Sequence, residues 1–353
     1  MLPLQTERSG SVWRIFVSKQ IRAVLFSVLV LSLLTVVSLK AQNKEKKNNQ
    51  NKGDDVNLNV DLVTLDAQVI RQNTSRIAWR LKQNDFVLFE DGVQQKITNF
   101  SQDTLPLSMI LLIDRRGCLD PFSDKIRNAI TENIKSLKKE DEIAVMTFAD
   151  KTNLVQRFTS DKNKIAETFA KLPLHDESDN HCFNVAFYDA ARYMRDSGNP
   201  QARRVIILLT AITKGINCGK PSSDDVTTEV LESDSTVCAL IPQEKGQAIE
   251  NGVMHGIAGL GQAMGAGTLN VKSLIEETGG ELVGAKPDNI EFMFDNLITR
   301  IRTRYAIGFV STNPKHDGVY RKLKLEIAPA TEKREGKLIV KTRRGYLAVK
   351  DKK

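Results

Sequence analysis

The chain has 353 residues, of which 41% are hydrophobic and 27% are charged, so it is long enough for one large hydrophobic core and a second, smaller one. Its formal net charge of +8 is partly local, because residues 1–41 carry five Lys or Arg and one Glu, which leaves +4 for the rest. No basic patch interleaved with aromatic residues is present, so we exclude nucleic acid as a partner.

The first 41 residues have the layout of a secretory signal peptide. A basic segment precedes Ala23–Leu39, which has 17 residues without a charge, and Lys40-Ala41-Gln42 then offers a cleavage position after Ala41. An uncleaved N-terminal anchor is the alternative, because the apolar stretch is long for a signal and short for a membrane span. In both cases we expect an exported protein, located in the periplasm, in the cell envelope or outside the cell. The polar segment 42–55 is predicted to be a disordered linker.

Residues 56–104 are predicted to form a β segment. Apolar and polar residues alternate from Val56 to Ile70, which is typical of a half-buried strand. Residues 85–92 then lead through a turn at Asp91-Gly92 into a second run, 93–100, and this pattern indicates two paired strands.

Residues 105–304 alternate between apolar runs and helical patterns. The stretch Ser108–Asp120 contains the run Met109–Ile113, which indicates a strand buried on both faces, and then an acid and a glycine-containing turn. Further strands are expected at 142–148, 204–210 and 236–241, and helices at 122–137, 162–172 and 184–195. This alternation predicts a doubly wound, mostly parallel α/β sheet with helices on both faces and a ligand site at the carboxyl ends of its strands.

The segment from Pro242 to Leu269 is rich in small residues. Gly259-Leu260-Gly261 invites comparison with a nucleotide-binding loop, but the preceding strand and the downstream acid are missing, so we favour a surface insertion. A helix is expected at 270–277, stopped by Thr278-Gly279-Gly280, before a short edge strand at 281–283.

The C-terminal residues 305–353 form a second predicted β segment, with strands at 305–311, 320–327 and 337–346. Neither β segment has enough strands to be stable alone. We therefore expect the two segments to join into one small β-sandwich, with the α/β region inserted between them.

Six short motifs occur in an order that resembles a von Willebrand factor A (VWFA) domain, specifically the bacterial exported VWFA-related group. They are LLID-x-x-x-C, DEIAVMTFAD, NVAFYDAARYM, RRVIILLTAIT, ETGGEL and IRTRYAIGF, and the likeness covers about Val56 to Val349. The resemblance implies a metal-ion-dependent adhesion site (MIDAS) that coordinates Mg²⁺. Its ligands are an Asp-x-Ser-x-Ser motif after the first strand, a Thr on a middle helix and an Asp after the fourth strand.

This chain keeps one of those five ligands, Asp114. The other four positions hold side chains that do not suit a hard cation: Arg116, Cys118, Val185 and, after Thr210, Ala211. We therefore expect a degenerate MIDAS with no metal and no cofactor. One hypothesis is that the Arg116 guanidinium takes the place of the cation beside Asp114. The alternative is that Arg116 faces solvent while Asp114 accepts hydrogen bonds from turn amides.

Disulfides are permitted in an exported chain. Cys118, Cys182 and Cys218 lie on loops that open at the same edge of the deduced sheet, so we favour a Cys182–Cys218 bridge, with Cys118–Cys182 next. Cys238 lies within an apolar strand and is expected to be a buried hydrophobic residue.

A soft metal bound by Cys118, His181, Cys182 and Cys218 is a rival, although their spacing matches no known zinc motif. The other histidines, His175, His255 and His316, have no partner pattern and are expected to be ordinary loop or surface residues.

No catalytic pattern stands out, since hydrolysis needs a nucleophile with a base or paired carboxylates in one cleft. Asp120, Asp150 and Asp189 are single acids. Cys118 follows Arg115 and Arg116, which could lower the pKa of its thiol, but no motif places a His beside it. We expect a protein that is not an enzyme.

The sequence favours a non-catalytic protein-binding or adhesion-type module of the cell envelope that needs no divalent metal and has an unknown protein partner. The alternatives are a structural scaffold subunit and metal-dependent adhesion through an unconventional site. Membrane contact is expected only through the N-terminal segment, if that segment is uncleaved. The predicted partner-binding residues lie on the degenerate MIDAS loops: Asp114, Arg115, Arg116, Cys118, Asn184, Val185, Thr210 and Ala211.

Overall fold

The computed structural model describes residues 62–78, 80–102, 105–175, 180–212, 218–243 and 269–350. The expected signal peptide, the 42–55 linker and nearly all of the glycine-rich segment after Pro242, with His255, lie outside the described residues. Among the helices in the described ranges, none combines the length and the apolar character that a membrane span requires.

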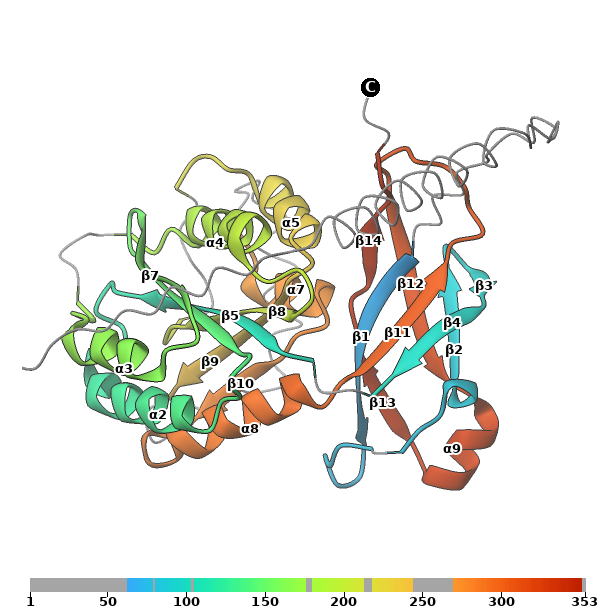
Figure 1. Cartoon of the computed structure of the whole chain (residues 1–353), viewed down its shortest axis with the longest axis horizontal. Coiled ribbons are helices and arrows are strands. Elements are labelled where there is room, and N and C mark those ends of the chain that lie inside the picture. Colours follow the sequence, from blue (N-terminus) through green and yellow to red (C-terminus); the bar gives the residue numbers. More distant parts are fainter. Residues whose placement is uncertain are drawn as a thin grey trace, which may run out of the picture. The chain divides into compact units, whose positions relative to one another are not determined.

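A six-stranded sheet forms the α/β region (Figure 1). Its spatial order is β10 (Leu282–Ala285), β9 (Thr236–Pro242), β8 (Arg203–Leu209), β5 (Leu107–Asp114), β6 (Glu142–Phe148) and β7 (Thr152–Thr159). All neighbours are parallel except β7, which pairs antiparallel with β6. The sequence did not predict β7, because this edge strand is largely exposed and shows no regular alternation.

Helices cover both faces of this sheet, as predicted. Every residue of β5 is buried, which explains the uninterrupted apolar run. Its odd-numbered residues pack with α2 (Ser123–Lys135), α3 (Lys162–Lys171) and α8 (Ile290–Arg302). Its even-numbered residues Ile110 and Leu112 pack with α4 (Phe183–Ser197), α5 (Ser223–Glu232) and α7 (Val271–Glu277). Short 3₁₀ turns occur at Gln83–Asp85, Asp120–Phe122 and Pro287–Asn289.

The flanking segments form the predicted small β-sandwich. One sheet has the order β13 (Leu338–Lys341), β1 (Leu62–Arg71), β11 (Tyr305–Val310) and β4 (Ile97–Ser101). The other has the order β14 (Gly345–Leu347), β12 (Tyr320–Ile327), β2 (Phe86–Glu90) and β3 (Val93–Gln95). Each sheet pairs N-terminal with C-terminal strands, and one hydrophobic cluster contains side chains from both.

Two predicted single strands are each divided between the sandwich sheets. The run 93–100 becomes β3 in one sheet and β4 in the other, and the run 337–346 becomes β13 and β14. A strand that changes sheet at a bend forms a corner of a sandwich. The helix α9 (Pro329–Glu335), which precedes β13, was not predicted.

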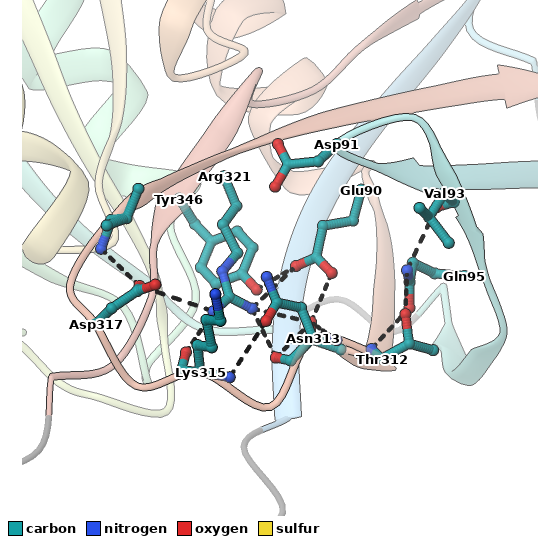
Figure 2. A network of polar contacts seen from close by, with 12 residues as sticks. Glu90, Asp91, Val93, Gln95, Thr312, Asn313, Lys315, Asp317, Arg321 and Tyr346 are labelled. Carbon is teal, nitrogen blue, oxygen red and sulfur yellow. Dashed lines mark hydrogen bonds and ion pairs between the residues drawn. The ribbon is translucent and has the colours of Figure 1, made fainter.

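A buried polar network fixes the loop after β11 (Figure 2). Arg321, only 3% exposed, donates to the carbonyl oxygen of Asn313 at 2.8 Å and to Ser311 Oγ at 3.1 Å. Ser311 and Tyr346 each donate a hydrogen bond to the buried Glu90 carboxylate. A charge in a core needs such partners, so we interpret this network as structural.

The α/β region and the sandwich are joined by a partly buried ion pair and a close backbone approach. Arg203, at the start of β8, contacts both carboxylate oxygens of Asp66 in β1 at 2.6 and 3.0 Å. Gly279 has a φ of +70°, and a Cβ there would lie 2.3 Å from the backbone of Thr342. The Gly-Gly pair therefore does more than end α7, because only glycine permits this contact.

Asp141 anchors the entrance to β6. Its fully buried carboxylate accepts from Arg302 at 2.6 Å and from the backbone N–H groups of Leu107 and Lys138 at 2.9 and 2.7 Å. Burial alone would raise the pKa of this carboxyl, but these hydrogen bonds outweigh it and hold the pKa below its usual value.

We predict that Asp141→Asn lowers the free energy of unfolding at neutral pH by about 3 kcal/mol, because it leaves Arg302 without its charge partner. A carboxyl with a lowered folded-state pKa contributes stability above pH about 4 and loses it as the pH falls through the folded-state value. The difference in the free energy of unfolding between wild type and Asp141→Asn should therefore become smaller as the pH is lowered. Urea unfolding at several pH values measures this difference. Asp150→Asn is the control, because residue 150 is exposed. Equal stability of wild type and Asp141→Asn at neutral pH would contradict this account.

Candidate functional site

The carboxyl ends of β5 and β8 form the topological switch point of the sheet. These strands are parallel neighbours, and the chain leaves β5 toward β6 but leaves β8 toward β9, on the other side. Ligand sites of open α/β sheets lie at such points. Asp114 is the last residue of β5 and Thr210 directly follows β8, so both lie there.

The Asp114 carboxylate is completely buried and is surrounded by groups from three loops. Its Oδ1 accepts from the Arg116 backbone N–H at 3.1 Å. Its Oδ2 accepts from Thr210 Oγ1 at 2.7 Å and from Cys118 Sγ at 3.4 Å, and lies 2.8 Å from His181 Nδ1. One carboxylate thus links the segments that follow β5, α3 and β8.

Asp114 and Arg116, for which the sequence suggested an ion pair, are joined through the Arg116 backbone N–H. Among the described residues, His181 Nδ1 lies 2.8 Å from Asp114 Oδ2, while residue 116 contributes its backbone N–H. The hydrogen bond from a turn amide to the Asp114 carboxylate, which the second hypothesis included, is therefore present. The reason is geometric, because a residue two positions after a strand end presents its amide to the preceding side chain.

The oxygen donors at this position do not fit Mg²⁺. Beside the Asp114 carboxylate, the described residues bring one hydroxyl, that of Thr210, together with a thiol and an imidazole. Val185 and Ala211 have no side-chain oxygen, whereas Mg²⁺ takes about six oxygen ligands in near-octahedral geometry. The donor chemistry agrees with the predicted degenerate MIDAS.

The Cys118 thiol is not activated as a nucleophile, because its pKa is raised. Burial raises the pKa of Cys118 to about 12, and the adjacent Asp114 carboxylate adds to the increase. The hypothesis that neighbouring arginines lower this pKa is therefore wrong, because the thiol faces a carboxylate and donates to it.

The predicted disulfide between Cys182 and Cys218 is confirmed, and Cys238 is completely buried as expected. The bridge joins the N-terminus of α4 to the loop after β8. It also removes two thiols from the four-residue soft-metal site considered above, so that ligand set is wrong. Of its members, Cys118 and His181 do converge, but on Asp114.

The predicted partner-binding residues divide into two groups by exposure. Asp114, Asn184 and Thr210 are at most 1% exposed and hold the loops together. Asn184 does so by donating to the Pro221 carbonyl oxygen at 2.8 Å. The remaining residues are partly exposed and line the rim of the site: Arg115, Arg116, Cys118, Val185 and Ala211.

Two histidines have larger roles than the sequence indicated. His181 was considered only as part of the rejected metal set, and its place beside Cys182 was the available signal. His175, expected to be an ordinary loop residue, contacts Asp120 at 2.8 Å through Nδ1, and its carbonyl oxygen accepts from Arg115 at 2.7 Å. These contacts hold the turn after β5 against the segment after α3.

We predict that the double substitution Cys182→Ala with Cys218→Ala lowers the free energy of unfolding by up to about 4 kcal/mol. The bridge closes a loop with a sequence separation of 36, and its loss frees the unfolded chain. Thermal unfolding with and without dithiothreitol measures the effect. Reductant should lower the melting temperature of wild type and leave that of the double variant unchanged. A melting temperature of wild type that does not respond to reductant would contradict the bridge.

Comparison with known proteins agrees with this fold. Residues 109–212 match the von Willebrand factor type A domain family. No curated protein matches the chain. Similar solved structures include BatB from Bacteroides thetaiotaomicron, with 14% identity over 55% of this chain and 98% of that one, at a TM-score of 0.39. An aerotolerance-related membrane protein from Bacteroides fragilis has 16% identity over 56% and 98%, at a TM-score of 0.39.

Proximal thread matrix protein 1 of the mussel byssus has 15% identity, and its TM-score is 0.41. The alignment covers 59% of this chain and 49% of the mussel chain. The family match starts within β5, ends just after β8 and therefore contains Asp114, Cys118, His181 and Thr210. The similarity to the von Willebrand factor type A domain family thus covers residues 109–212, which lie in the α/β region.

Proposed function

We propose that this protein is a non-catalytic protein-binding module of the cell envelope, which recognises its partner through the rim of the degenerate MIDAS and needs no Mg²⁺. The observation that carries the proposal is the replacement of the hard-cation ligands by contacts within the protein. Three loops that a cation would gather are instead held by Asp114, by Asn184 and by the Cys182–Cys218 bridge.

A preorganised rim supports binding, because ordering loops during association costs free energy. Arg115, Arg116, Val185 and Ala211 are each partly exposed around the buried carboxylate, and Lys220 of the bridged loop is exposed. The rim therefore combines small apolar surfaces with positive charge, which suits a protein partner that presents acidic side chains.

The envelope location rests on the sequence of residues 1–41 and is supported by the disulfide, since such bridges persist in oxidising compartments. The alternative is a scaffold role, in which the rim contacts no partner. The following experiment distinguishes this role from partner binding by the rim.

We predict that Arg116→Glu and Val185→Glu each reduce capture of partner proteins from envelope extracts at least about tenfold, because each places an acid on a rim that is proposed to bind acidic side chains. Lys324→Glu is the control, since this side chain is 72% exposed and belongs to β12 of the sandwich rather than to the rim. Quantitative mass spectrometry of pull-downs measures capture, with and without millimolar Mg²⁺.

Capture should be the same in both Mg²⁺ conditions and equal for wild type and Lys324→Glu. Equal capture by wild type and both rim variants would favour the scaffold role. A requirement for Mg²⁺ would favour metal-dependent adhesion through an unconventional site.

A further inference from the structure

Three side chains of different chemistry converge at the switch point and form what we name the soft-donor cluster: Asp114, Cys118 and His181. Their possible ligand atoms all lie within 4.8 Å of one another. They come from two segments, the end of β5 with its following turn and the residue that precedes Cys182. The spacing of these three residues in the sequence matches no known metal-binding motif.

Two of the three separations within the cluster can be compared with those of a tetrahedral zinc site, and the third, from Cys118 Sγ to the His181 ring nitrogen, is at most 4.8 Å. With Zn–O and Zn–N bonds of about 2.0–2.1 Å and a Zn–S bond of about 2.3 Å, tetrahedral geometry separates O from N by about 3.3 Å and O from S by about 3.5 Å. Asp114 Oδ2 lies 2.8 Å from His181 Nδ1 and 3.4 Å from Cys118 Sγ. Small rotations of the Asp114 and His181 side chains would increase the distance between Oδ2 and Nδ1 to the value that a bound ion requires.

The donor types exclude hard cations and suit zinc. Thiolate and imidazole favour Zn²⁺ over Mg²⁺ or Ca²⁺, which require oxygen ligands. Charge also balances. When Zn²⁺ binds, the Cys118 thiol releases its proton to solvent, so two negative ligands offset the charge of the ion beside a neutral imidazole. A neutral assembly is the form that a buried position tolerates.

The surroundings supply orientation and access. Thr210 Oγ1 donates to Asp114 Oδ2 at 2.7 Å, and such a hydrogen bond to a ligating carboxylate orients a metal ligand. The disulfide at Cys182 fixes the residue next to His181. The His181 side chain is 18% exposed, while that of Asp114 is fully buried, so solvent reaches the cluster through His181.

We propose that the soft-donor cluster is a zinc site, in which Asp114, Cys118 and His181 bind one Zn²⁺ and leave a fourth position for water or a donor group of a partner. This goes beyond the proposed function, which concerns recognition of a partner by the rim and does not depend on a bound metal. Zinc binding is a property of the purified chain, so it can succeed or fail independently of partner capture.

The test is equilibrium dialysis of the purified full chain, without a histidine tag, against Zn²⁺, followed by metal analysis. We expect one Zn²⁺ per chain. Cys118→Ala and His181→Ala should each weaken binding by more than about 100-fold, and Thr210→Ala by about 10- to 100-fold. His316→Ala is the control, because this histidine lies between β11 and β12 of the sandwich, outside both the cluster and the turn after β5, and it should bind like wild type.

Substitution of Co²⁺ for Zn²⁺ in wild type gives a measurement that does not depend on any variant folding. Ligation by Cys118 predicts a thiolate-to-cobalt charge-transfer band in the near ultraviolet, absent from Cys118→Ser. Circular dichroism verifies that each variant is folded. Absence of the band from wild type, or zinc binding that persists unchanged in folded Cys118→Ala and His181→Ala, would overturn the proposal.

Discussion

A buried carboxylate must be neutralised, and this constraint at Asp114 organises the α/β region of the protein. The side chain lies at the end of a strand that is buried on both faces, so water cannot solvate its charge. In this chain the compensation comes from His181, Thr210, Cys118 and a turn amide. Each of these groups belongs to a loop at the same edge of the sheet, so satisfying one charge fixes the arrangement of that edge.

The loops are also joined in ways that do not depend on the carboxylate. The Cys182–Cys218 bridge and the Asn184 contact to Pro221 both connect the start of α4 with the chain after β8. The contacts of His175 hold the turn after β5. A rim that is held by covalent and hydrogen-bonded links is ordered before any partner arrives, which reduces the entropic cost of binding.

Much of the fold could be predicted from local pattern. The run Met109–Ile113 reads as a strand because both its faces are buried, and the Cys182–Cys218 pair followed from the loops that the topology brings together. The place of His181 could not be predicted, since no periodicity surrounds it and its contact with Asp114 is tertiary. The division of residues 93–100 between two sheets could not be predicted either, because a strand that bends from one sheet to the other keeps the same sequence pattern as a single strand.

The central claim is that Asp114 sits in an environment of soft donors that rejects Mg²⁺ and accepts Zn²⁺. A crystal structure of the protein grown with millimolar Mg²⁺ and then soaked in Zn²⁺, with anomalous data at the zinc absorption edge, tests it most directly. The account predicts no ion at Asp114 before the soak and an anomalous peak in contact with Asp114, Cys118 and His181 after it. A Mg²⁺ ion coordinated by Asp114 would contradict it.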